Sequence, residues 1–265
     1  MSDPSSAPAA LLVDRDPEGV VTLTFNRPRV LNALDWEAME TFGREVEALH
    51  EETAEGGGPR LLILTGAGQR AFCSGGDQAM LHTQLAAADG ERLARLMGQA
   101  LRRLEQLPIP TLAAVNGFAL GGGSEIALAC DLRVVDEAVR FGLVHGKLGL
   151  IPGWGAGQRL LRLLGPARTM ELMLSGRQLG AAELAQLGLA TRRAPEGGAL
   201  AAARELAAEI LGLDAGVVRA VKALIAAGRE LPYAAALDAE ASLFPALWAG
   251  EAHVRAVAAF LGRRG

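Results

Sequence analysis

The chain has 265 residues, half of them hydrophobic, which is enough for a substantial core in one or two domains. The 26 Lys and Arg residues and 30 Asp and Glu residues give a net charge of −4, which argues against a nucleic-acid-binding protein. Two cysteines, Cys73 and Cys130, are too few for a disulfide scaffold and indicate a reducing compartment, so we expect a cytoplasmic protein. Residues 1–10 lack the features of a signal peptide, and no apolar run is long enough to span a membrane.

Strands and helices alternate along the first part of the chain. Residues 1–10 are expected to form a flexible tail. Alternating or short apolar runs predict strands at 20–25, 61–65, 111–115 and 132–135. Apolar residues at helical spacing predict helices at 36–52, 91–107 and 124–129.

From residue 158 onward, helical spacing dominates, and the last 65 or so residues are predicted to be helices only. This order predicts an α/β core followed by a helical appendage. We therefore expect a core at 11–195 and a C-terminal helical region at 196–265.

Three glycine-rich loops, at 66–77, 117–125 and 142–157, each follow an apolar strand. Unpaired N–H groups in such loops, near a helix N-terminus, can form an anion site. Tight turns explain any one loop equally well, but three in one half of the chain favour a shared site. The G-x-G-x-x-A stretch at 66–71 is not followed by a helix, so it does not predict a dinucleotide site.

Glu125 differs from the other acidic residues because it follows Gly123 and Ser124 at the start of a predicted apolar helix. The helix dipole stabilises a carboxylate at that position. From the residues alone, Glu125 is either a catalytic acid or an ordinary first-turn acid. The four histidines have no metal-ligand spacing, so no metal site is expected.

Five stretches occur in order between residues 26 and 153, within a resemblance that covers about residues 11–262. They are Asn26-Arg27-Pro28 with Leu31-Asn32-Ala33-Leu34, AFCSGGD from residue 71, AVNGFALGGGSE from residue 114, Cys130-Asp131, and LGLIPG from residue 148. Together they resemble the crotonase, or enoyl-CoA hydratase/isomerase, superfamily. The resemblance implies a right-handed spiral of ββα units with a C-terminal helical trimerisation region, in a homotrimer or a dimer of trimers.

The resemblance also implies an acyl-CoA thioester as substrate, so that coenzyme A enters with the substrate and no cofactor is permanently bound. By position, the N–H groups of Gly76 and Gly122 would form an oxyanion hole, and Glu125 would be the main acid/base. Hydration of a 2-enoyl-CoA or double-bond isomerisation is the expected reaction. An acyl-CoA decarboxylase, hydrolase or ring-modifying enzyme is the alternative. A non-catalytic binding or assembly subunit is a further alternative, against which the retained glycine loops and Glu125 argue.

Two residues blur the choice of reaction. His145 stands where the family's hydratases have a second glutamate. It could transfer protons, since the pKa of an unperturbed histidine is ~6.5, or it could only line the pocket. Trp154 is either a wall for a bulky acyl group or an ordinary packing residue.

The resemblance places one segment along the adenine and pantetheine parts of coenzyme A, and its candidate binding residues are Ser74, Asp77, Gln78 and Ala79. Family members often have a lysine at the position of Ala79, so a phosphate partner is expected elsewhere. Arg27 and Arg29, in the matching N-terminal turn, are the candidates, although both could equally be solvated arginines. No nucleic-acid partner and no membrane association are expected.

Overall fold

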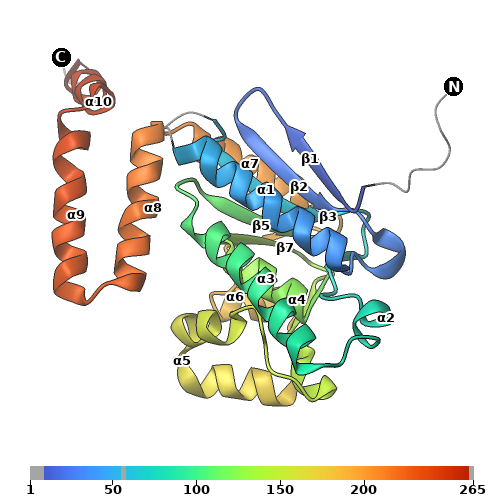
Figure 1. Ribbon diagram of the computed structural model, residues 1–265. Coiled ribbons are helices and arrows are strands. Elements are labelled where there is room, and N and C mark those ends of the chain that lie inside the picture. The colour runs from blue at the N-terminus through green and yellow to red at the C-terminus, as the bar shows by residue number, and fades with distance from the viewer. Residues whose placement is uncertain (1–8, 55–57, 263–265) are drawn as a thin grey trace, which may run out of the picture.

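The computed structural model describes residues 9–54 and 58–262, so most of the predicted tail lies outside it (Figure 1). Its strands are β1 (Leu11–Arg15), β2 (Val20–Phe25), β3 (Leu61–Gly66), β4 (Ala71–Cys73), β5 (Thr111–Val115), β6 (Phe118–Leu120), β7 (Leu132–Asp136), β8 (Arg140–Gly142) and β9 (Arg192–Ala194). Its α-helices are α1 (Trp36–Ala54), α2 (Gln78–Leu81), α3 (Ala87–Gln106), α4 (Gly122–Ala129), α5 (Ala156–Ser175), α6 (Ala181–Gln186), α7 (Ala199–Leu211), α8 (Ala215–Glu230), α9 (Tyr233–Trp248) and α10 (Glu251–Gly262). Two short 3-10 helices, η1 (Pro28–Val30) and η2 (Val144–Leu148), lie in loops.

The larger sheet has six strands in the order β1-β2-β3-β5-β7-β9, and only the β1–β2 pair is antiparallel. Every residue of β3 and β5 is buried, as expected for central parallel strands covered on both faces. Helices α1 and α3 pack together over one face, and α7 packs against β3, β5, β7 and β9 on the other. The predicted strands and helices are therefore present, with ends shifted by a few residues.

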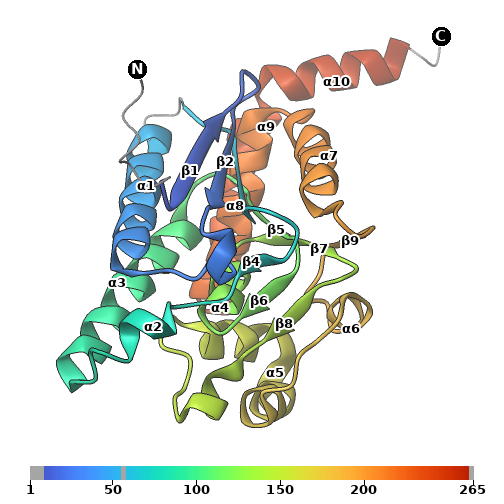
Figure 2. The same cartoon turned by 90° about the vertical axis from the view of Figure 1, so that its right-hand side faces the viewer.

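A second, parallel sheet has the order β4-β6-β8, with three residues in each strand. Each of these strands follows a strand of the larger sheet, β4 after β3, β6 after β5 and β8 after β7 (Figure 2). The chain therefore winds through both sheets and a helix in each turn, which confirms the α/β spiral. Because β4 and β6 lie inside segments predicted as glycine-rich loops, the sequence analysis missed them; three residues carry no readable periodicity.

The last three helices stand apart from this core. Helices α8 and α9 form an antiparallel hairpin, and α10 leaves it at an angle (Figures 1 and 2). We call α8, α9 and α10 the C-terminal arm. Helix α7 also lies within the predicted helical region 196–265, but it packs on the sheet and is not part of the arm. The division of the chain at residue 196 stays a prediction.

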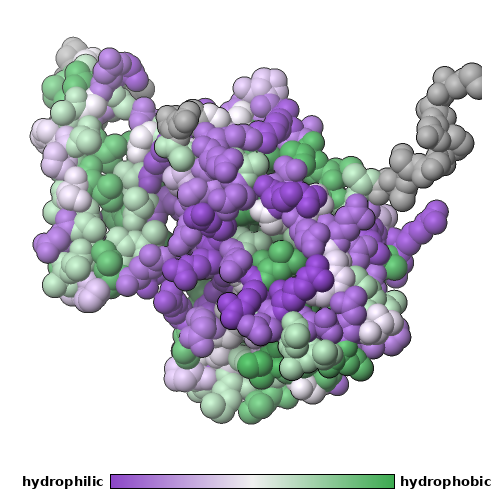
Figure 3. Space-filling view, in the orientation of Figure 1, coloured by the Kyte–Doolittle hydropathy of each residue, from purple (hydrophilic) through white to green (hydrophobic). Residues whose placement is uncertain are grey.

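Large apolar side chains remain exposed on the arm. They are Val221, Ile225, Leu231, Tyr233, Leu237, Phe244, Trp248, Val254, Val257, Phe260 and Leu261. Figure 3 shows many hydrophobic side chains on the surface of these helices, whereas the surface of the neighbouring α/β core is predominantly hydrophilic in this view. Among the described residues, no helix is long and apolar enough to cross a membrane.

Candidate active site

Helix α4 brings Glu125 into the interior. Ser124 fixes the first turn of the helix, because its hydroxyl hydrogen lies between the carbonyls of Ala119 at 2.6 Å and Gly142 at 2.9 Å from Oγ, and Oγ accepts from the N–H of Gly142 at 3.2 Å. Ser124 is completely buried, so these bonds give it a structural role. The N-terminus of α4 is thereby tied to β6 and β8.

The two carboxylate oxygens of Glu125 have different surroundings. Oε2 accepts hydrogen bonds from the backbone N–H groups of Trp154 at 2.8 Å and Ala156 at 3.0 Å. Oε1 lies 3.1 Å from Nε2 of His145. Within the described part of the chain, neither Oε1 nor Nδ1 of His145 has a hydrogen-bond partner, although both are buried. Glu125 is 1% exposed, so Oε1 is a buried acceptor left available for chemistry.

The structure therefore brings together Glu125 and His145, which are twenty residues apart in the sequence. Helix η2 carries His145, and its ring lies over Gly121, the residue before α4. Contact with Glu125 places His145 at the site, but it does not decide between proton transfer and lining, so the catalytic role stays a prediction.

The N–H group of Gly76 points away from the neighbouring segment at Leu34, with which Gly76 forms an isolated β-bridge. Leu34 donates to the carbonyl of Gly75 and accepts from the N–H of Asp77, both at 2.8 Å. Because alternate residues of an extended segment face opposite sides, the N–H of Gly76 faces away from Leu34. No protein acceptor is found for it among residues 9–54 and 58–262.

The N–H of Gly122 is also available, because the first residues of a helix have no intrahelical acceptor. The two loops approach closely: a Cβ on Gly75 would lie 2.9 Å from the Gly122 nitrogen. A Cβ on Gly122 would lie 2.1 Å from the ring of Trp154. Among the described residues, the site thus has two N–H groups without a protein acceptor, one in the loop at Gly76 and one at the start of α4. This geometry suits a polarised oxygen, and the oxyanion hole itself stays a prediction.

Arg27 is already paired with carboxylates. Its Nη1 donates to Asp77 Oδ2 at 2.9 Å and to the Ala33 carbonyl at 2.6 Å, and its Nη2 lies 3.0 Å from Asp35 Oδ2. Asp77 also caps α2 by accepting from the N–H of Ala79 at 3.1 Å. Arg27 therefore holds the loop beside Gly76, and its contact with a phosphate stays a prediction.

The other predicted coenzyme A residues lie on the surface next to Gly76. Ser74 Oγ donates to the Val30 carbonyl at 3.4 Å, and Gln78 Nε2 donates to the Gly76 carbonyl at 3.4 Å. Both bonds are long, Gln78 is exposed and Ser74 is half-buried, so both side chains can move toward a ligand. Their binding role remains a prediction.

Trp154 is 5% exposed and packs directly on Gly122. It also lines a cavity of about 1180 Å³ between α3, α5, α7 and α8. None of Gly76, Gly122, Glu125 and His145 lines that cavity, so the cavity lies beside the site. Trp154 is thus both a packing residue and the partition between the two.

Several residues that build the site were missed by the sequence analysis. Asn116 joins two glycine loops by donating to the carbonyls of Gly66 and Gly68, both at 2.7 Å. The backbone donors from Trp154 and Ala156 carry no side-chain signal, so sequence could not have indicated them. In the described ranges, no group of three His, Cys, Asp or Glu side chains could hold a metal ion.

A family model described as enoyl-CoA hydratase/isomerase matches residues 15–265. The chain belongs to this family. It is 34% identical to ethylmalonyl-CoA decarboxylase from Gallus gallus over 95% of this chain and 84% of the relative. It is 33% identical to short-chain-enoyl-CoA hydratase from Clostridium acetobutylicum over 92% of each chain.

The fold agrees with this membership. The crystal structure of enoyl-CoA hydratase from Bacillus anthracis has a TM-score of 0.88 and 32% identity, and the match covers 96% of this chain and 97% of that one. The predicted crotonase superfamily is therefore confirmed. Relatives in this family are named for two reactions, hydration and decarboxylation. The choice between these reactions therefore has to be argued from the geometry of the site.

Proposed function

We propose that this member of the enoyl-CoA hydratase/isomerase family adds water to a 2-enoyl-CoA thioester. The observation that carries the proposal is the buried Glu125, with one oxygen fixed by backbone donors and the other free beside His145. The thioester carbonyl would accept hydrogen bonds from the N–H groups of Gly76 and Gly122. Such donors stabilise a developing enolate by about 3–4 kcal/mol each, and the N-terminal end of α4 adds a favourable dipole.

The proton route uses the contact between Glu125 and His145. Oε1 of Glu125 takes a proton from water as the water oxygen bonds to C3 of the substrate. His145, in its protonated form, gives a proton to C2 of the enolate. Transfer across the 3.1 Å contact from Glu125 to His145 then restores both groups. The same groups can move a proton between C2 and C4, which is the isomerisation of a 3-enoyl-CoA.

Decarboxylation of a 2-carboxyacyl-CoA is the second candidate. Breaking the bond to the carboxyl group releases CO2 and leaves its electrons in the same enolate, which is then protonated at C2. This reaction needs no water and no second carboxylate. By the resemblance, His145 stands where the family's hydratases have that carboxylate, and relatives from three organisms are named ethylmalonyl-CoA decarboxylase.

The test follows the ultraviolet absorbance of crotonyl-CoA and, in parallel, CO2 release from ethylmalonyl-CoA. For a hydratase we expect wild-type protein to remove the enoyl absorbance, and Glu125→Gln to lower kcat by roughly 10²–10⁴-fold because it cannot take the proton. Wild-type rates in Glu125→Gln would contradict the proton-transfer role. CO2 release without hydration would establish the second candidate instead.

His145→Ala and His145→Gln distinguish the two interpretations of His145. If His145 is the second acid, hydration falls in both variants while binding of the CoA ester is retained. A change in acyl-chain preference alone would make His145 a wall of the pocket. His145→Glu, which installs a second carboxylate, should keep hydration above the level of His145→Ala.

We also propose that the protein is a homotrimer or dimer of trimers that buries the C-terminal arm. The exposed apolar side chains of α8, α9 and α10 support this proposal, because contiguous apolar surface of this kind marks an interaction site. A cytoplasmic location is proposed from the two cysteines, which are both free and buried.

A further inference from the structure

Arg159, on α5, lies directly behind the active-site loop. Its Nη1 donates to the carbonyl of Trp154 at 2.7 Å, and its Nη2 donates to Glu105 Oε2, on α3, also at 2.7 Å. The side chain of Arg159 is only 11% exposed and that of Glu105 is 24% exposed. This is a partly buried, charge-assisted pair that a neutral side chain could not replace.

The contact is made to the same residue that binds the catalytic carboxylate. The N–H of Trp154 donates to Glu125, and the carbonyl of Trp154 accepts from Arg159. The second donor to Glu125 is the N–H of Ala156, two residues further along. Arg159 therefore binds the short segment 154–156, which supplies both backbone donors to Glu125.

The conformation of this segment depends on contacts from outside it, because the segment contains Gly155, which has a φ of +103°. That left-handed conformation costs glycine little, but glycine also leaves the loop free to adopt others. A Cβ on Gly155 would lie 2.7 Å from Nη1 of Arg159, so the guanidinium fills the space that a side chain would occupy. Arg159 thus restricts the conformation of this loop, which its own glycine residues leave free.

We infer that Arg159, held by Glu105, is a positioning residue that keeps Trp154 and Ala156 aimed at Oε2 of Glu125. With Oε2 bound, Oε1 stays directed at the reacting atoms and His145. Loss of Arg159 lets the loop and the carboxylate turn, which lowers the rate of proton transfer and leaves substrate binding intact. The inference rests on the proposed role of Glu125.

A purely structural ion pair between α3 and α5 predicts something different. In that case removal of Arg159 lowers stability, and it lowers activity by the same factor whatever residue stands at position 125. A positioning role predicts that the effect on kcat disappears when Glu125 is already disabled. The double-mutant comparison therefore separates the two.

The experiment measures kcat, KM and the thermal midpoint for Arg159→Met, Arg159→Lys and Glu105→Gln with the turned-over acyl-CoA. We expect kcat of Arg159→Met to fall roughly 10–100-fold with KM within about twofold, as a small misplacement of a reacting group does. Arg159→Lys keeps the positive charge beside Glu105, but an ammonium group cannot reach both Glu105 and the Trp154 carbonyl as the guanidinium does. Compared with Arg159→Met, it should therefore recover more of the stability than of kcat. Arg162→Met is the matched control, because Arg162 is exposed on the same helix and its side chain has no hydrogen bond or ion pair within the described residues.

Arg159→Met is then combined with Glu125→Gln, whose residual rate is measured at high enzyme concentration. No further loss in the double variant supports the inference. An undiminished further loss, or kcat of Arg159→Met within twofold of wild type, overturns it. If Arg159→Met does not fold, Glu105→Gln serves in the same comparison with the same two outcomes. Wild-type kcat in Glu125→Gln alone would instead overturn the proposed function.

Discussion

Glu125 is buried, and a buried carboxylate without hydrogen-bond partners is unfavourable. The structure satisfies Oε2 with two backbone donors and leaves Oε1 within 3.1 Å of His145. Backbone donors suit this task, since a side-chain substitution at Trp154 or Ala156 does not remove them. One residue thus combines a fixed orientation with an available acceptor.

The two cysteines make a prediction at the same scale. Burial raises the pKa of Cys73 and of Cys130 to about 12 from a usual value of 9.0. Both thiols therefore stay protonated in the folded protein, while those of the unfolded chain ionise above about pH 9. Their stabilising contribution is complete below pH 9 and is lost as the pH rises from 9 toward 12.

Between pH 8 and pH 10, we expect each thiol to reduce the free energy of unfolding by about 1.4 kcal/mol, the equivalent of one pKa unit. Urea denaturation at the two pH values measures this loss. The Cys73→Ala/Cys130→Ala double variant should lose correspondingly less over the same interval. An equal loss in wild type and variant would show that other groups cause it.

At the scale of elements, α4 is anchored at both ends. Ser124 fixes its first turn, and Arg133 binds its last carbonyls, donating through Nη1 to Cys130 at 2.7 Å and Ala127 at 3.4 Å. Nε of Arg133 donates to the Leu189 carbonyl at 2.5 Å. Burial lowers the pKa of the Arg133 guanidinium. A cation at a helix C-terminus is also favourable to the helix dipole.

Arg133→Met should therefore lower the free energy of unfolding by about 2–4 kcal/mol, because it leaves buried carbonyls without donors. Chemical denaturation at neutral pH measures the change. Arg140→Met is the control: the Arg140 side chain is exposed, and within residues 9–54 and 58–262 its one hydrogen bond is to the neighbouring Val139 carbonyl, so a change below about 0.5 kcal/mol is expected. Equal effects of the two substitutions would contradict the anchoring role.

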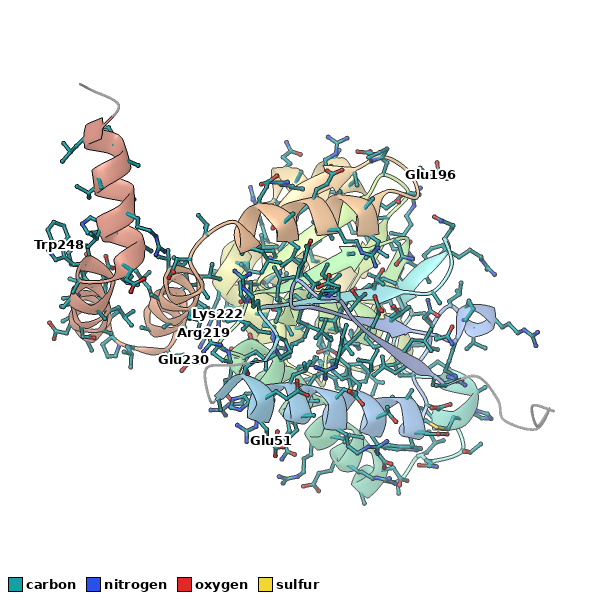
Figure 4. The ribbon with its side chains drawn as sticks, turned by 90° about the horizontal axis from the view of Figure 1, so that it is seen from above. Glu51, Glu196, Arg219, Lys222, Glu230 and Trp248 are labelled. Carbon is teal, nitrogen blue, oxygen red and sulfur yellow. The ribbon has the colours of Figure 1, made fainter. Side chains whose placement is uncertain are left out.

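At the scale of the whole molecule, the arm is attached to the core mainly through α8. Lys222 forms an ion pair with Asp131, whose carboxylate also accepts from the N–H and hydroxyl of Thr111 at 2.9 and 3.0 Å. Figure 4 shows Lys222 between α8 and the core, and Trp248 at the far side of the arm. Trp248 packs there against the rings of Phe244 and His253, with centroids 5.6 and 4.7 Å away.

If copies of the chain bury this surface, Trp248→Glu should dissociate the oligomer to a smaller species, measured by light scattering after size-exclusion chromatography. Tyr233→Glu, at a side chain 80% exposed, tests the same surface without disturbing the ring cluster. Glu196→Lys is the control, because Glu196 lies on the core away from the arm (Figure 4). An unchanged mass in both arm variants, or a monomeric wild type, would contradict the proposed assembly.

The sequence by itself determined the alternation of strands and helices, the glycine loops and the carboxylate at the start of α4. Apolar periodicity and the backbone freedom of glycine are local properties, so they can be read without the fold. The helical character of the C-terminal region was readable for the same reason. The packing of α7 on the sheet could not be predicted from the sequence, because the spacing of apolar residues shows that a helix has an apolar face but not which element covers that face.

Only the tertiary structure decided which of these residues meet. The 3.1 Å contact between Glu125 and His145, the pairing of Arg27 with Asp35 and Asp77, and the link from Glu105 through Arg159 to Trp154 all join separate elements. Such contacts depend on how the strands and helices pack and on where each side chain then reaches. No local pattern records that geometry, and the backbone donors to Glu125 carry no residue type that could signal it.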